Sequence, residues 1–76
     1  MLSEEQESYV DDYYYSCLSE LTYGTSREVL ISMLLQFEED EDYLACAGIK
    51  KGLEFYDMQV LTQKIVETNN QEDEQL

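Results

Sequence analysis

The chain has 76 residues, which is enough for one small domain and too short for a polymerase or another large catalytic fold. Its 18 acidic and 4 basic residues give a formal net charge of −14, so we expect no direct binding to nucleic acid or to an anionic membrane. With no histidine and no glycine-rich phosphate loop, the usual acid–base and nucleophilic sites cannot be built. We therefore expect no enzymatic activity, no catalytic residue, no cofactor and no metal site.

The first predicted helix begins at Ser3. Ser3 and Gln6 have the spacing of a capping box, and the carboxylates of Glu4 and Glu5 suit the positive end of a helix dipole. Apolar residues then recur every three or four positions, which predicts one buried stripe. The stripe comprises Val10, Tyr13, Tyr14, Cys17, Leu18 and Leu21.

Residues 9–12, YVDD, resemble letter for letter the box of reverse transcriptases, in which paired aspartates hold the catalytic magnesium ions. In that family the box lies on a tight turn between two strands and works with a distant third carboxylate. Here the four residues fall inside a predicted amphipathic helix. We therefore expect Asp11 and Asp12 to be surface carboxylates.

The second predicted helix follows a turn at Gly24, where Thr25 and Glu28 repeat the capping-box spacing. Its apolar residues cover more than one face, which predicts that this helix is the central one. It should end in the acidic run EEDED at 38–42, because adjacent carboxylates repel each other and oppose the helix dipole. Asp40 and Asp42 have the spacing of two calcium ligands, but Leu44 and Ala45 do not continue that pattern. We interpret the run as a negative patch for a basic partner.

The third predicted helix carries Cys46, Ile49, Leu53, Tyr56 and Val60 at heptad-like spacing. It is either one long helix kinked near Asp57, or it is followed by a fourth helix that Asp57 caps. The predicted fold is an all-α, small antiparallel bundle of three helices, with four as the alternative. Residues 1–68 form the expected domain, and residues 69–76 an acidic flexible tail. The expected core comprises Leu18, Leu21, Leu30, Met33, Leu34, Phe37, Ile49 and Leu53.

Small residues at one-turn spacing, Ala45, Gly48 and Gly52, indicate the close approach of another helix, either within the chain or as a docking groove. The two cysteines, Cys17 and Cys46, lie at apolar positions without a metal-binding motif, so we expect buried free thiols. The first residues lack the pattern of a signal peptide, and no apolar run is long enough to span a bilayer. We therefore expect a cytoplasmic protein.

Residues 26–56 resemble the UVR motif of excision-repair nuclease subunits and some protease adaptors, in which an acidic turn precedes a helix. The matching positions are Asp42, Tyr43, Cys46, Ala47, Ile49, Lys50 in place of arginine, and Leu53. Leu44 and Lys51 stand where the motif has glutamate and aspartate, which alters its charge pattern. The resemblance implies a helical hairpin used for protein contact and no catalysis.

Size, acidity and the absence of catalytic residues together resemble the DNA-mimic and anti-defence inhibitors of phages and other mobile elements. Carboxylates on helices rising about 1.5 Å per residue can reproduce the charge spacing of DNA, about 1.7 Å of axis per phosphate. We therefore expect a protein that occupies a basic, nucleic-acid-binding surface of a partner. A UVR-like adaptor and a self-associating structural protein, for example a homodimer, are the alternatives. The expected partner-binding residues are Glu4, Glu5, Asp11, Asp12, Glu38, Glu39, Asp40, Glu41 and Asp42.

Overall fold

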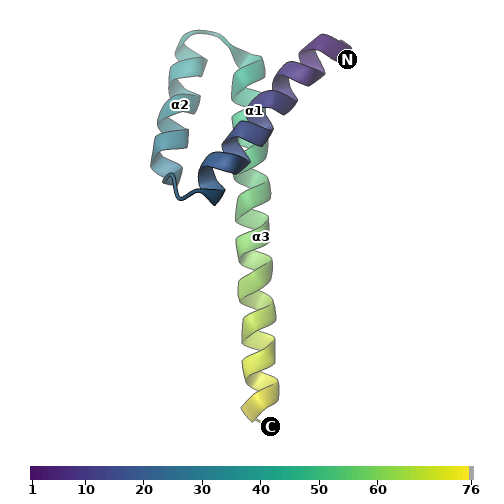
Figure 1. The fold of residues 1–76 in the computed structure, drawn as a ribbon, viewed down its shortest axis with the longest axis vertical. Coiled ribbons are helices and arrows are strands. Elements are labelled where there is room, and N and C mark those ends of the chain that lie inside the picture. The colour runs from purple at the N-terminus through teal and green to yellow at the C-terminus, as the bar shows by residue number, and fades with distance from the viewer. Residues whose placement is uncertain (76) are drawn as a thin grey trace.

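The computed structural model of the chain describes the backbone of residues 1–75 and the side chains of residues 1–66. Residues 1–75 form three α-helices: α1 (Glu4–Thr22), α2 (Arg27–Glu39) and α3 (Tyr43–Gln75) (Figure 1). The all-helical prediction is confirmed, and the fourth helix is not supported because α3 continues past Asp57. The expected boundary at residue 68 stays a prediction, since the side chains of 67–75 and all of residue 76 lie outside the described residues.

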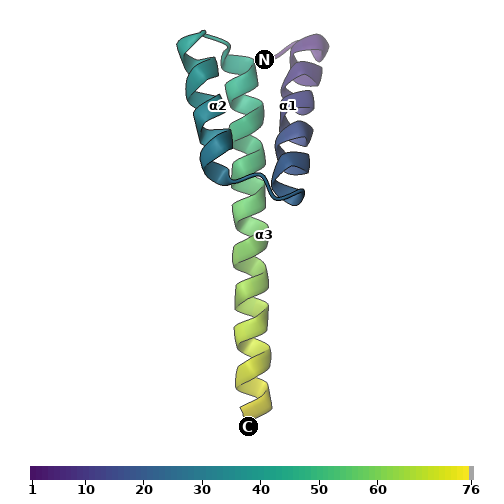
Figure 2. The same cartoon turned by 60° about the vertical axis from the view of Figure 1, so that its left-hand side comes forward.

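Consecutive helices run in opposite directions, and α1 and α2 lie on either side of the first half of α3 (Figure 2). Both pack mainly against α3 and touch each other little. The prediction that the second helix is central is therefore wrong, because α3 is the element that the other two share. We call residues 1–56 the head and residues 57–75 the stalk.

The length of α3 determines the shape of the molecule. Its 33 residues span about 50 Å at 1.5 Å per residue, close to the longest dimension of 54 Å. The other two dimensions are 26 and 18 Å. The second half of α3 therefore extends beyond the helices that cover its first half (Figure 1).

The start of α1 has the predicted capping box. The Ser3 backbone N–H donates to Gln6 Oε1 at 2.9 Å, and the Gln6 N–H donates to Ser3 Oγ at 3.1 Å. The start of α2 differs from the prediction by one residue, because Ser26 rather than Thr25 is the N-cap. Thr25 instead donates its hydroxyl to Glu20 Oε2 at 2.7 Å, which connects the turn to the end of α1.

Helices α1 and α2 end in the same backbone motif. After α1, Thr25 N–H donates to Glu20 O at 2.9 Å and Gly24 N–H to Leu21 O at 3.2 Å, which is a Schellman motif with Gly24 at φ 99°. After α2, Asp42 N–H donates to Phe37 O at 2.8 Å and Glu41 N–H to Glu38 O at 3.1 Å. The left-handed position is here occupied by Glu41, at φ 61°.

The core lies where the first half of α3 meets α1 and α2. Its buried cluster comprises Cys17, Leu21, Leu30, Ile49 and Leu53, with Tyr13, Leu34, Phe37 and Tyr56 packed against it. Of the predicted core residues, Leu18 is only half-buried and Met33 is 40% exposed. The prediction for Met33 follows from its helical spacing with Leu30, Leu34 and Phe37, and it is wrong. Helix α2 contacts the rest of the chain mainly through α3, which leaves Met33 outside the buried part of that face.

The small residues of α3 lie against α1. A Cβ added to Gly48 would be 2.5 Å from the Val10 carbonyl oxygen and 2.6 Å from Tyr13 Cβ. One added to Gly52 would be 2.8 Å from both Cβ and Sγ of Cys17. Ala45, one turn earlier, is fully buried. The close approach that this spacing indicates is therefore made within the chain, and α1 fills the groove.

Candidate functional site

The acidic turn, residues 38–42, comprises the last two residues of α2 and the connection to α3, and it is the densest group of carboxylates in the head. Its backbone is closed by the Schellman motif described above, and the helices on both sides anchor its ends. Glu38, Glu39, Asp40 and Glu41 are exposed, whereas Asp42 is half-buried. Four of the five carboxylates are therefore available to a partner from a defined backbone.

Asp42 has a structural role. Its Oδ1 accepts the Ala45 backbone N–H at 3.2 Å, which caps the start of α3. Its Oδ2 accepts the Tyr9 hydroxyl at 2.7 Å, which joins α1 to the turn. Because both oxygens of this carboxylate are engaged within the chain, we remove Asp42 from the partner-binding set and assign it to holding the turn.

An aromatic row supports the turn from the side of α1. The rings of Tyr9 and Tyr13 have centroids 5.1 Å apart, and Tyr13 meets Phe37 of α2 edge-on at 5.2 Å. The hydrogen bond to Asp42, with a smaller contribution from Tyr13, raises the pKa of the Tyr9 hydroxyl above its ordinary value. Tyr9 therefore remains a donor over the whole neutral range.

The structure brings only some of the expected partner-binding residues together. The start of α1, with Glu4 and Glu5, lies at the same end of the head as the acidic turn (Figures 1 and 2). We call this end, with Glu4, Glu5 and the exposed residues 38–41, the acidic end. The acidic end therefore combines expected partner-binding residues from two segments that are distant in the sequence.

The two aspartates of the YVDD stretch lie farther along α1 and are exposed. Asp11 is two positions from Tyr9, about 200° around the helix, and so faces away from the acidic turn. It shares a hollow with Glu7 and Lys51, and the Lys51 amino group lies 4.8 Å from the Tyr14 ring centre. Asp11 and Asp12 are thus surface carboxylates of a helix and do not lie on a tight turn between strands.

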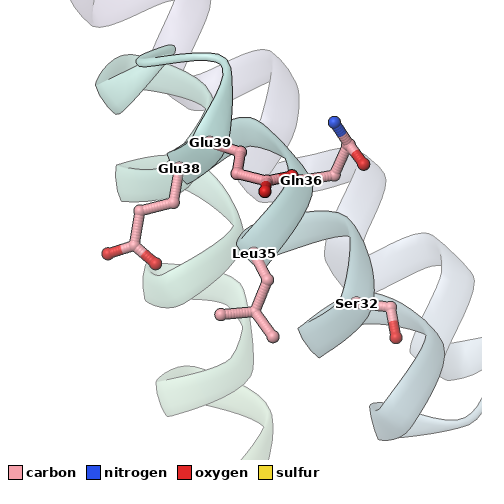
Figure 3. A pocket seen from close by; sticks show the side chains of 5 residues that line it. All are labelled: Ser32, Leu35, Gln36, Glu38 and Glu39. Atoms are coloured by element: carbon pink, nitrogen blue, oxygen red, sulfur yellow. The ribbon is translucent and has the colours of Figure 1, made fainter.

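The outer surface of α2 is a feature that the sequence reasoning missed. Leu35 is 57% exposed in a shallow depression that is also lined by Ser32, Gln36, Glu38 and Glu39 (Figure 3). Figure 3 shows Leu35 and Glu38 projecting to the same side of the helix. Val29 and Ile31 are also exposed. The apolar width of this helix, which predicted a central position, instead leaves apolar side chains exposed, of which Leu35 lies beside the acidic turn.

Both cysteines are free, as predicted, but only Cys17 is buried, and Cys46 is half-buried. Cys17 is buried and its Sγ–H donates to Ile49 O at 3.5 Å, while that of Cys46 donates to Leu34 O at 3.6 Å. Burial raises the pKa of both thiols, and the nearby Glu38 and Asp42 raise that of Cys46 further. Both side chains are therefore protonated at neutral pH and pack as small apolar groups.

Two further observations concern the described residues alone. None of their helices is both long and apolar enough to cross a membrane. Nor do their cysteine, aspartate and glutamate side chains gather in a group of three or more that could hold a metal ion.

No protein-family model, curated protein or solved structure matches the chain. The candidate site therefore depends on its own geometry: a braced acidic turn, the acidic start of α1 at the same end, and an exposed leucine beside them.

Proposed function

We propose that this chain is a non-enzymatic, cytoplasmic inhibitor that occupies a basic, nucleic-acid-binding surface of a partner protein, as DNA-mimic and anti-defence proteins do. The observation that carries the proposal is the acidic turn, whose exposed carboxylates stand on a backbone braced by Asp42 and Tyr9. Because the backbone of the turn is already fixed, its residues lose little backbone freedom on binding. The two free thiols support a location in a reducing compartment.

The net charge of the chain predicts how its association rate depends on salt. A chain with formal net charge −14 is attracted over a long range by a lysine- and arginine-rich surface, and salt screens that attraction. The acidic end would form the first contact, because residues 38–41 and the start of α1 lie there together. Leu35, beside Glu38 and Glu39, offers an apolar anchor at the edge of the same surface.

The experiment starts from a pair of charge-matched double variants. Glu38→Gln with Glu39→Gln neutralises two exposed residues of the acidic end. Glu28→Gln with Glu54→Gln neutralises two exposed residues elsewhere in the head. Because Glu38 and Glu39 lie at the unfavourable end of the α2 dipole, removing their charge does not weaken the helix. Reduced binding would therefore not come from unfolding.

Proteins retained by the immobilised parent chain and lost with the Glu38/Glu39 variant are then purified singly. Each is titrated with fluorescent duplex DNA or RNA in the presence of the chain. We expect the chain and the nucleic acid to exclude one another, and the Glu28/Glu54 variant to compete nearly as well as the parent. A retained protein that binds both ligands at once would contradict the proposal.

The adaptor alternative is favoured by one observation, the exposed apolar side chains of α2. Helices α2 and α3 form a hairpin whose other face, at Ala45, Gly48 and Gly52, is already covered by α1. An adaptor would therefore dock through Ile31 and Leu35, which lie about 40° apart around α2. Its binding would resist salt and would be lost in Leu35→Ser, whereas the inhibitor's binding would fall steeply with salt.

A further inference from the structure

The stalk carries an apolar stripe that no described element covers. Phe55 at the end of the head is 42% exposed, and along the stalk Met58 is 68%, Leu61 59%, Ile65 53% and Val66 51% exposed. Phe55, Met58, Leu61 and Ile65 recur at steps of three and four, so they share one side of α3, and Val66 lies at the edge of that side. The core-facing residues of α3, such as Ile49 and Leu53, lie on its other side.

An apolar stripe of this kind is expected to pack against another apolar surface. An isolated helical segment of this length is only marginally stable in water, and most helices in proteins are stabilised by packing an apolar face. Contacts of α1 and α2 with α3 reach Phe55, which meets Tyr14 edge-on, and Asp57, which pairs with Arg27 at 2.7 Å. Beyond them, the stripe continues with the spacing of a coiled-coil seam.

The charges around the stripe indicate what covers it. Of the 18 acidic residues, only Asp57 falls within 55–66, and it is paired with Arg27. The polar residues of that segment are otherwise Gln59, Thr62, Gln63 and Lys64. A basic amphipathic helix would find no free carboxylate to pair with in this segment. A second copy of the chain that docked at this segment would meet no block of like charge. At the acidic end, in contrast, the carboxylates of two copies would repel each other.

We propose that two copies of this chain associate through the stripe formed by Phe55, Met58, Leu61, Ile65 and Val66. The stripe is about 18 Å long at 1.5 Å per residue, which places the interface at the small end of specific contacts, where association is weak and transient. The dimer is therefore concentration-dependent. Since the heads repel each other, its formation is favoured by salt, which screens that repulsion.

Sedimentation equilibrium on the full chain, from about 5 µM to about 1 mM at low and high salt, tests the proposal. We expect the mass to rise from 8.9 kDa towards twice that value with concentration, and to rise at lower concentration in high salt. The opposite salt dependence separates this association from the proposed binding to a basic partner, so either can fail without the other.

Two variants of equal charge locate the interface. Leu61→Glu places a carboxylate in the stripe, and Gln63→Glu places one about 200° around the same helix. We expect at least a tenfold weaker dimer for Leu61→Glu and a much smaller effect for Gln63→Glu. Because Leu61 is exposed and does not belong to the core cluster, the melting temperature of the dilute monomer should be similar in both variants.

Three results would overturn the proposal. The first is a mass of 8.9 kDa at every concentration and salt. The second is a dimer that both variants weaken equally. The third is a monomer in which Leu61→Glu abolishes binding to a basic partner, because that would assign the stripe to the partner instead.

Discussion

The hydroxyl of Tyr9 lies 2.7 Å from Oδ2 of Asp42 and joins two residues 33 positions apart. This contact connects the YVDD stretch to the acidic run, the two segments that stand out in the sequence. It gives both a structural reading: Tyr9 helps to hold the turn, and Asp42 receives that bond while capping α3. The carboxylates left for a partner are those of residues 38–41.

The Tyr9–Asp42 bond should make the stability of the chain depend on alkaline pH. The bond raises the pKa of Tyr9 in the folded state, whereas a tyrosine in the unfolded chain titrates near pH 10. Its stabilisation is therefore fully present below about pH 10 and is lost as the pH rises further. Urea unfolding of the parent and of Tyr9→Phe between pH 7 and 11 measures this. The difference in unfolding free energy between them should shrink above pH 10, and a constant difference would show that the bond does not contribute.

The left-handed residues after α1 and α2 predict opposite effects of substitution. Glu41 holds φ 61°, a conformation that costs a non-glycine residue about 1 kcal/mol. Glu41→Gly should therefore raise the unfolding free energy by about 1 kcal/mol, while Glu41→Gln, with the same charge change, should have little effect. Gly24→Ala should lower it by a similar amount through its φ of 99° alone, because no atom lies within 4 Å of the added Cβ. Chemical denaturation measures these unfolding free energies. Equal unfolding free energies for Glu41→Gly and Glu41→Gln would contradict the account.

Gly48→Ala should destabilise the head, although the same change in an exposed helix stabilises by about 1 kcal/mol. The added methyl group would lie 2.5 Å from the Val10 carbonyl oxygen, so α1 would have to move away from α3. We expect a loss of about 1–3 kcal/mol or more. Thermal unfolding measures it, with Gly52→Ala as a second case at the same contact. A gain in melting temperature in either variant would show that the two helices are not so close.

Leu30 and Met33 both belong to the predicted core, but only Leu30 is buried in the structure. Leu30 is 1% exposed, so Leu30→Ala should cost about 2–5 kcal/mol, a large fraction of the stability of so small a domain. Met33 is 40% exposed, and Met33→Ala should cost much less. Similar losses in the two variants, measured by urea unfolding, would mean that Met33 is as well covered as Leu30.

Local signals predicted the helices well. Ser3 and Gln6 form the capping box that their spacing indicates, and Gly24 holds the left-handed position expected after a helix. The start of α2 was misplaced by one residue because Thr25 and Ser26 are both good caps, and the bond from Thr25 to Glu20 decides between them. The position of Glu41 could not be predicted, since nothing in an acidic run marks a left-handed residue.

Tertiary relationships were harder to derive from the sequence. The apolar width of α2 was read as burial on several sides, whereas Leu35 and Val29 are exposed. The spacing of Gly48 and Gly52 correctly indicated a close helix contact but could not tell whether its partner was α1 or another chain. Nothing local to Tyr9 or Asp42 predicted their bond, because it depends on how α1 crosses the start of α3.

The association rate with a retained basic partner, measured across a salt series, tests the central claim most directly. The parent, the Glu38/Glu39 variant and the Glu28/Glu54 variant are compared while ionic strength shortens the Debye length from about 30 to about 8 Å. The account predicts a steep fall with salt for the parent, a slower association and a flatter fall for the Glu38/Glu39 variant, and near-parental rates for the control. Equal rates for the two variants, or a rate that salt does not change, would contradict it.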